Sequence, residues 1–182
     1  MLREFNINGP ALKTAHNIRH WIGLQMKIEE KLLQLCQKKQ LTLGAAESCT
    51  GGAFSARLTA IPDASKCFMG SIVAYTNTVK TKLLNIPQEK IEKYGAVSLP
   101  VVTSMLEAVC MQLNSALGVA ITGFAGPTGG TSEAPIGTVF IAVGGKGLPT
   151  KTIHLHLKGS RQEIIQQTVE YAILALVEIL EP

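Results

Sequence analysis

The chain has 182 residues, of which 46% are hydrophobic, and this size and composition suit one compact domain with a short appendage. Its formal charge of +4 arises in residues 1–40, which carry seven Lys or Arg against three acids, whereas residues 41–182 carry ten of each. Because the globular part is neutral and only 5% of the residues are aromatic, the composition disfavours a nucleic-acid-binding protein.

The sequence also disfavours export and membrane insertion. No window reaches the ~18 consecutive apolar residues of a membrane span, and the first ten residues lack the apolar core of a signal peptide. The four cysteines (Cys36, Cys49, Cys67 and Cys110) show no paired spacing and have no histidine nearby. We therefore expect a cytoplasmic protein without a zinc site or any other bound metal.

Two segments differ in their patterning. Residues 1–26 contain Asn, Gly, Pro and dispersed charge with little periodicity, and we interpret them as an N-terminal appendage, with Met26 as an alternative start. Residues 27–182 form the predicted domain.

Hydrophobic periodicity and turn residues predict the elements of this domain. In chain order they are a helix over 27–39, a strand over 41–46, a helix over 51–61, a strand over 67–75, helices over 76–84, 87–95 and 100–113, a strand over 117–122, a hairpin with strands 137–145 and 151–158, and a last helix opened by a capping box of Ser160 and Glu163. The β-α-β-α-β order with a terminal hairpin predicts an α/β fold, in which helices cover both faces of a mixed, mostly parallel sheet.

Polar segments follow three of the predicted strands. They are ESCTGG at 47–52, YTNTVK at 75–80 and TGFAGPTGGT at 122–131. Ligands bind beyond the carboxyl ends of the strands in such sheets, so the coincidence predicts a site at that edge.

Ser48 has two interpretations. Its hydroxyl suits a helix cap, which an isolated serine at a strand-to-helix turn favours, or a nucleophile beside free backbone N–H groups. Thr50 could be the cap instead, leaving Ser48 free. Cys49 is a rival nucleophile, although a small buried thiol is the favoured interpretation. Glu47 suits either a contact with a base or a ribose hydroxyl, or an ordinary loop carboxylate.

A serine nucleophile needs a base, and the histidines do not supply one. His16 and His20 lie in the appendage, while His154 and His156 alternate with apolar residues on the polar face of a strand. The remaining candidates are Lys80 and, as a proton relay, Tyr75. Spacing alone favours a surface lysine at position 80.

The glycine-rich stretch at 123–137 offers unhindered N–H groups, and with the Thr122 and Thr131 hydroxyls it suits a phosphate or a ribose. It lacks the ending of a P-loop and the spacing of a dinucleotide fingerprint. A plain connector is an equal interpretation.

These motifs together resemble a known family. AESCTGG, YTNTVK, YGAVS at 94–98, ITGFAGPTGGT with PIGTV, and GSRQEI with TVEYAILAL occur in the order and spacing of the CinA C-terminal domain family, the nicotinamide mononucleotide deamidases. The resemblance covers residues 28–180. It implies a three-layer α/β/α sandwich, a cytoplasmic homodimer or higher homo-oligomer, and hydrolysis of nicotinamide mononucleotide to nicotinate mononucleotide and ammonia in pyridine nucleotide recycling, without a cofactor.

The resemblance also implies roles for individual residues. Ser48 is the nucleophile, Lys80 the base and Tyr75 its partner, while the helix start after Ser48 engages the carboxamide. The residues that it implies for substrate binding are Glu47, Thr50, Gly51, Gly52, Asn77, Ala96, Val97, Ser98, Thr122, Gly123, Gly126, Gly129, Gly130, Thr131 and Arg161.

The chain departs from the family pattern at two positions. Ala134 and Ile165 stand where many relatives carry a cation, which leaves Arg161 as the clearest positive group of those segments. Two alternatives therefore stay open: a non-catalytic nucleotide-binding or competence- and damage-associated protein, and an amidase for another small substrate.

Overall fold

A computed structural model describes residues 27–181, so the predicted appendage at 1–26 lies outside the described residues. The elements alternate along the chain as expected. They are α2 (Ile28–Lys38), β1 (Leu43–Glu47), α3 (Ala53–Thr59), the 3₁₀ turn η1 (Ala64–Lys66), β2 (Phe68–Val73), α4 (Asn77–Leu84), α5 (Gln88–Tyr94), α6 (Leu99–Gln112), β3 (Leu117–Gly123), β4 (Thr138–Gly145), β5 (Leu148–His156) and α7 (Arg161–Leu180).

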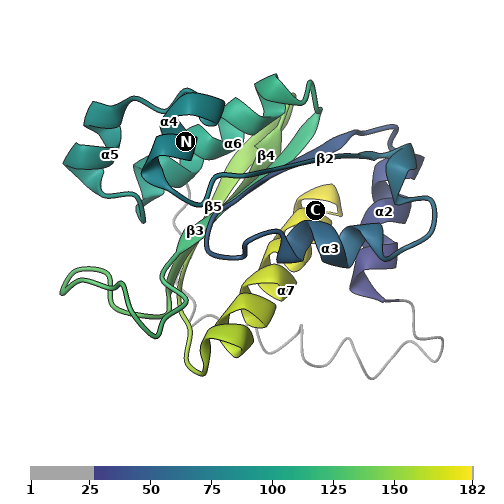
Figure 1. Ribbon diagram of the computed structural model, residues 1–182. Helices are drawn as coiled ribbons and strands as arrows, with labels where there is room; N and C mark the ends of the chain where they lie inside the picture. The colour runs from purple at the N-terminus through teal and green to yellow at the C-terminus, as the bar shows by residue number, and fades with distance from the viewer. Residues whose placement is uncertain (1–26, 182) are drawn as a thin grey trace.

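Helices cover both faces of one five-stranded sheet (Figure 1). Helices α2, α3 and α7 pack on one face, and α4, α5 and α6 pack on the other. Each face has its own buried apolar cluster. The α/β fold and its three layers are therefore confirmed.

The strand order is β2-β1-β3-β4-β5. Strand β1 pairs in parallel with both β2 and β3, while β3–β4 and β4–β5 are antiparallel, so β4 alone runs against the other four strands. The carboxyl ends of β1, β2 and β3 consequently meet at one edge, where β4 begins and β5 ends. The three polar segments at 47–52, 75–80 and 122–131 each follow a strand at this edge.

Small residues bring α6 close to the centre of the sheet. Ala46, Ala120 and Ala142 face the α6 side, whereas larger side chains such as Ile121 and Ile141 face α7. Gly118 continues the small row, since an added Cβ would meet side chains of α6. The larger side chains of the sheet therefore face α7, and the small residues on the opposite face allow α6 to approach closely.

Most predicted boundaries differ from the structure by one to three residues, and two of these differences have a clear physical reason. The helix predicted over 51–61 begins only at Ala53, because Gly51 and Gly52 have φ angles of 59° and 100° and form a turn. Strand β5 begins at Leu148, inside the predicted turn, and includes Pro149. An edge strand tolerates this proline because it needs no N–H for a further neighbour.

Gly118→Ala tests the close approach of α6. The new methyl group would clash with Cys110 Sγ and lie 2.8 Å from Leu106 Cδ1. Overpacking at a buried position costs about 1–3 kcal/mol, which lowers the melting temperature of a chain of this size by about 3–10 °C. Calorimetry measures the shift. Adding Cys110→Ala removes the clashing sulfur and should recover part of the loss; an unchanged melting temperature in the single variant would contradict this packing.

Candidate active site

A sharp turn joins β1 to α3 and carries Ser48 at the end of the strand. The Ser48 N–H donates to Ile121 O at 3.0 Å, which continues the pairing of β1 with β3. Gly51 N–H then donates back to Ser48 O at 3.0 Å. The chain therefore reverses directly after Ser48, which holds this residue at the sheet edge.

The Glu47 carboxylate fastens the same turn from inside the fold. One of its oxygens accepts hydrogen bonds from Thr50 Oγ1, Gly52 N and Phe54 N at 2.8, 3.0 and 3.1 Å. The other accepts from Ser55 N at 3.0 Å and Ser55 Oγ at 2.6 Å. Its side chain is 0% exposed. This carboxylate therefore satisfies the N–H groups at the start of α3, where negative charge also complements the helix dipole.

This arrangement changes the expected roles of the ESCTGG segment. The N–H groups of Gly51 and Gly52, expected to engage a carboxamide, already have acceptors within the turn. The Thr50 hydroxyl donates to the buried Glu47 carboxylate. That carboxylate, and not Thr50, accepts hydrogen bonds at the helix start as a side-chain cap would. Ser48 caps nothing, so its hydroxyl is left for another partner.

That partner is Lys80, on the second turn of α4. Its side chain is only 2% exposed, although spacing alone favoured a surface lysine. Lys80 Nζ lies 3.0 Å from Ser48 Oγ and 2.9 Å from Ala74 O. No carboxylate forms an ion pair with Lys80 among residues 27–181. Burial therefore lowers the pKa of this amine below its ordinary value, and the nearby Cys49 opposes the shift only in part.

Cys49 does not compete as a nucleophile. Burial raises the pKa of its thiol to about 12, so the thiolate is scarce at neutral pH. The side chain is 6% exposed and packs near the end of β3, where a Cβ on Gly123 would lie 3.1 Å from the sulfur. This placement agrees with the favoured interpretation of a small buried thiol.

Ser48 and Lys80 open into a cavity of about 270 Å³. Nine of the residues expected from the sequence line it: Ser48, Tyr75, Asn77, Lys80, Ala96, Val97, Thr122, Gly123 and Arg161. The wall at Ala96 is held in place by Thr122 Oγ1, which donates to Ala96 O at 2.9 Å. The end of β3 thus fixes the loop before α6 against the site.

Arg161 connects three parts of the cavity wall. It is the first residue of α7 and lies between Ser160 and Glu163, the two residues of the capping box. Its guanidinium donates to Gly126 O at 2.7 Å and to Tyr75 Oη at 3.0 Å. Tyr75 is 55% exposed, and no hydrogen bond joins it to Lys80 or Ser48 in the described part of the chain. The contact between Lys80 and Ser48 is therefore direct.

The other expected substrate-binding residues lie outside the cavity lining. Glu47, Thr50, Gly51 and Gly52 belong to the fastened turn described above, and Ser98 donates to Gly95 O at 2.8 Å. Gly126, Gly129, Gly130 and Thr131 lie in the loop that projects from the sheet edge between β3 and β4 (Figure 1). The tip of this loop closes on itself, since Thr131 N donates to Ala134 O and Ala134 N donates to Thr131 Oγ1.

Four lining residues were not expected as site residues: Cys49, Phe124, Ala125 and Thr128. Three of them, Phe124, Ala125 and Thr128, belong to the glycine-rich stretch, and the first two carry apolar side chains that a pattern of glycines and hydroxyls does not indicate. Phe124 is fixed at both backbone groups, by its N–H to Thr138 O and its carbonyl to Gly137 N. Adjacency to Thr122 and Gly123 was the available signal for these positions.

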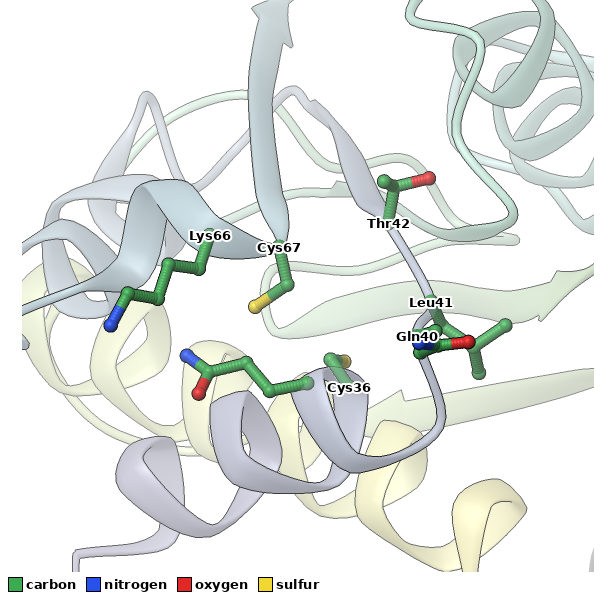
Figure 2. A pocket seen from close by; sticks show the side chains of 7 residues that line it. Cys36, Gln40, Leu41, Thr42, Lys66 and Cys67 are labelled. Carbon is green, nitrogen blue, oxygen red and sulfur yellow. The ribbon is translucent and has the colours of Figure 1, made fainter.

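A second cavity, of about 400 Å³, lies at the opposite edge of the sheet, beside the amino ends of β1 and β2 (Figure 2). Cys36 and Cys67 line it together with Gln40 and Lys66. A hydrogen bond between the two thiols lowers the pKa of Cys67 and raises that of Cys36. None of the residues predicted for the site lines this cavity, so the smaller cavity is the one that matches the predicted site.

Among residues 27–181, no three His, Cys, Asp or Glu side chains gather as metal ligands would. No helix in the same range has the length and apolar composition needed to cross a membrane.

The fold and site define a class: a three-layer α/β protein with a serine and a buried lysine in contact at the carboxyl edge of its parallel strands. Residues 25–180 match the model of the CinA C-terminal domain, and the chain belongs to that family. It is 44% identical over 142 residues to a CinA-like protein of Gemmatimonas aurantiaca, covering 78% of this chain and 33% of the relative. A CinA-like protein of Dictyoglomus thermophilum is 47% identical over 141 residues, covering 77% and 34%. The chain spans about a third of the length of these relatives.

Solved structures of the same family share the fold. The competence damage-inducible protein A from Klebsiella pneumoniae superposes with a TM-score of 0.80 at 28% identity, covering 83% of this chain and 93% of that one. A CinA superfamily protein from Escherichia coli has a TM-score of 0.78 at 30% identity, covering 97% and 99%. The expected homo-oligomer and cytoplasmic location stay predictions.

Lys80→Met tests the burial of the amine. Between the lowered pKa of the folded state and the ordinary pKa of the unfolded state, only the unfolded chain binds the proton, so the free energy of unfolding rises with pH. The variant should lose this rise and, at pH 7, have a higher free energy of unfolding than the wild type. Urea unfolding at several pH values measures both. The exposed neighbour Lys82 provides the control, Lys82→Met; identical pH dependence in all three proteins would contradict the burial.

Proposed function

We propose that this chain is an amidohydrolase that deamidates nicotinamide mononucleotide, with Ser48 as nucleophile and Lys80 as base. The observation that carries the proposal is the 3.0 Å contact between Lys80 Nζ and Ser48 Oγ within the cavity wall. A base must lie within about 2.6–3.2 Å of the proton-bearing atom that it serves, and this contact meets that requirement.

The surroundings of the amine suit it to act as a base. Burial favours its neutral form, which has a lone pair for the Ser48 proton. Ala74 O accepts one N–H at 2.9 Å and so fixes the direction of the amine. A lysine held in this way performs the function that a histidine has in other serine hydrolases.

The reaction has two halves. Ser48 Oγ attacks the amide carbon while Lys80 takes its proton, and the C–N bond then breaks as the same proton passes to the departing ammonia. Water next attacks the resulting ester, Lys80 takes a proton from it, and that proton returns to Ser48 Oγ as the carboxylic acid leaves and gives its remaining proton to solvent. Proton transfer between Ser48 and Lys80 uses their direct contact, so the proposal needs no relay through Tyr75.

Support for a nucleotide substrate comes from the rest of the wall. Arg161 and Asn77 place a cation and an amide in the same cavity as the serine. The guanidinium has five N–H donors and gives one to Gly126 O and one to Tyr75 Oη, so donors remain for an anionic group. Family membership supports the same substrate class.

A second candidate is an amidase for an uncharged small amide. Among the described residues that line this cavity, Arg161 is the only basic side chain besides the buried amine of Lys80, whose neutral form burial favours. Ile165, one of the two departures from the family pattern, packs against the apolar core beneath α7, and Ala134 lies at the loop tip. Ammonia release from nicotinamide mononucleotide, nicotinamide, NAD and simple amides separates the candidates; turnover of simple amides alone would favour the second.

Ser48→Ala and Lys80→Ala test the catalytic pair. Each should lower kcat for ammonia release by about 10³-fold or more, because neither group forms the acyl intermediate alone. Cys49→Ala is the matched control for the neighbouring thiol and should keep most of the activity. Full ammonia release by either catalytic variant would refute the mechanism, and loss in Cys49→Ala alone would assign the nucleophile to Cys49.

The pH dependence of the rate gives an independent test. Because the neutral amine is the base and burial lowers its pKa, kcat/KM should rise with pH and level off below the ordinary lysine pKa. The residual activity of Lys80→Ala should lack this rise, whereas Lys82→Ala should keep it. A rate independent of pH across the range from 6 to 10 would argue against lysine as the base.

A further inference from the structure

We propose that Glu47 is a positioning residue: its carboxylate occupies the start of α3 and thereby holds Ser48 Oγ at Lys80 Nζ. This inference deepens the proposed function and rests on its serine nucleophile. It changes the role expected for Glu47, from a substrate contact to an internal support of the turn.

Hydrogen-bond donors surround the Glu47 carboxylate. The carboxylate accepts from three backbone N–H groups, those of Gly52, Phe54 and Ser55, and from two hydroxyls, those of Thr50 and Ser55. Backbone N–H groups only donate, so each requires an acceptor in this buried place. A side chain without two acceptor oxygens at this position leaves part of the turn unsatisfied.

Glu47 also lies directly beside Ser48, the proposed nucleophile. Its backbone is the last residue of β1 and is fixed on both sides, since Ala74 N donates to Glu47 O at 2.7 Å and the residue pairs with Ile121 of β3. Ser48 is therefore held between a strand and a turn that both depend on Glu47. Ala74 also supplies the carbonyl that anchors Lys80 Nζ. One residue thus connects the supports of both reacting groups.

The Glu47 carboxylate also affects where an anion can bind. A free helix start would attract a negatively charged group of the substrate or its intermediate. Here Glu47 already fills that place, and the N–H groups of Gly51 and Gly52 are paired within the turn. The N–H of Cys49, next to Ser48 and in a residue that lines the cavity, has no oxygen acceptor among the described residues and contacts only its own thiol sulfur. The support from Glu47 therefore decides where that remaining donor lies relative to the nucleophile.

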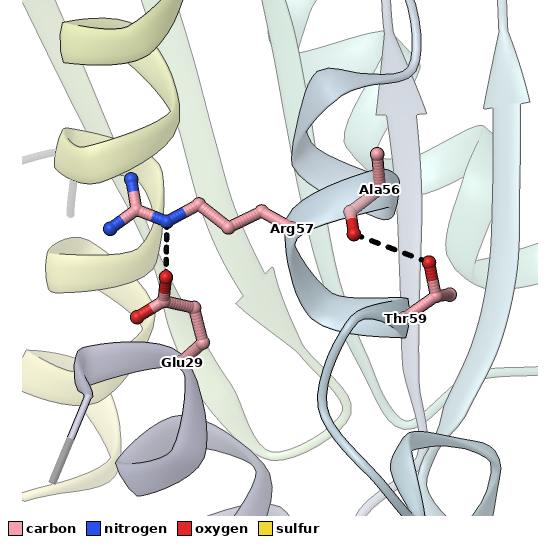
Figure 3. Close-up of polar contacts among 4 residues, drawn as sticks. All are labelled: Glu29, Ala56, Arg57 and Thr59. Atoms are coloured by element: carbon pink, nitrogen blue, oxygen red, sulfur yellow. Dashed lines mark hydrogen bonds and ion pairs between the residues drawn. The ribbon is translucent and has the colours of Figure 1, made fainter.

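A second carboxylate provides a matched comparison. Glu29 of α2 binds the guanidinium of Arg57, which lies on α3 about one turn beyond its start (Figure 3). Burial acts to raise the pKa of Glu29, but the bond from Arg57 holds it below the ordinary value. Glu29 and Glu47 both hold α3 in place, but only Glu47 holds the turn with Ser48.

The experiment compares Glu47→Gln with Glu29→Gln by labelling with a biotinylated alkyl fluorophosphonate. In this reaction Ser48 Oγ bonds to phosphorus, the P–F bond breaks, fluoride leaves, and the Ser48 proton goes to Lys80. Labelling is measured well below the melting temperature of each variant, and labelled peptide is identified by mass spectrometry. A rate per folded molecule does not respond to a loss of stability alone.

We expect Glu47→Gln to lower the labelling rate and kcat by about 100-fold, as a displacement of about 1 Å does, with KM little changed. Glu29→Gln should lower the melting temperature and leave the rate within about threefold, because its contact is remote from the turn. Thr50→Val, which removes one donor to Glu47 Oε2, should give an intermediate loss and serves if Glu47→Gln does not fold.

Equal labelling rates in Glu47→Gln, Thr50→Val and the wild type would overturn the inference, as would equal losses in Glu47→Gln and Glu29→Gln. Failure of the proposed function has a different signature: the wild type is labelled at Ser48 but releases ammonia from no amide. A wild type that is not labelled at Ser48 would overturn both.

Discussion

The site depends on a lysine amine that is buried without an acidic partner. Removing the Lys80 ammonium from water is costly, and the fold offers it only neutral acceptors, Ser48 Oγ and Ala74 O. The neutral amine is the form that such surroundings favour. A group that would be an inert surface cation elsewhere thus becomes a candidate base, at the expense of folding stability.

The negative charge of the site lies on the other side of Ser48. Glu47 precedes Ser48 and is directed into the fold, where five hydrogen bonds hold it at the start of α3. Ser48 is directed to the cavity and Lys80. The turn therefore separates the carboxylate from the amine, which prevents an ion pair that would keep the lysine charged.

Much of the fold and part of the site follow from local patterns. The apolar periodicity of α2 and α6, the Ser160–Glu163 capping box, and the short buried strands were all visible in the sequence and are confirmed. The convergence of three polar segments at one sheet edge follows from strand direction alone. The spacing of Lys80 indicated the wrong environment, since burial depends on how far α4 lies from the end of β1, and no local pattern encodes that distance.

The sequence by itself determined the elements, their α/β order, the edge that carries the chemistry and the family, because periodicity, turn residues and motif order are local properties. The tertiary structure decided which residues meet. It placed Lys80 against Ser48 across 32 residues of sequence, joined Arg161 to Tyr75 across 86, and turned Glu47 from the cavity into the helix start. Contacts between such distant segments depend on sheet order and helix packing, which act only when the whole domain is folded.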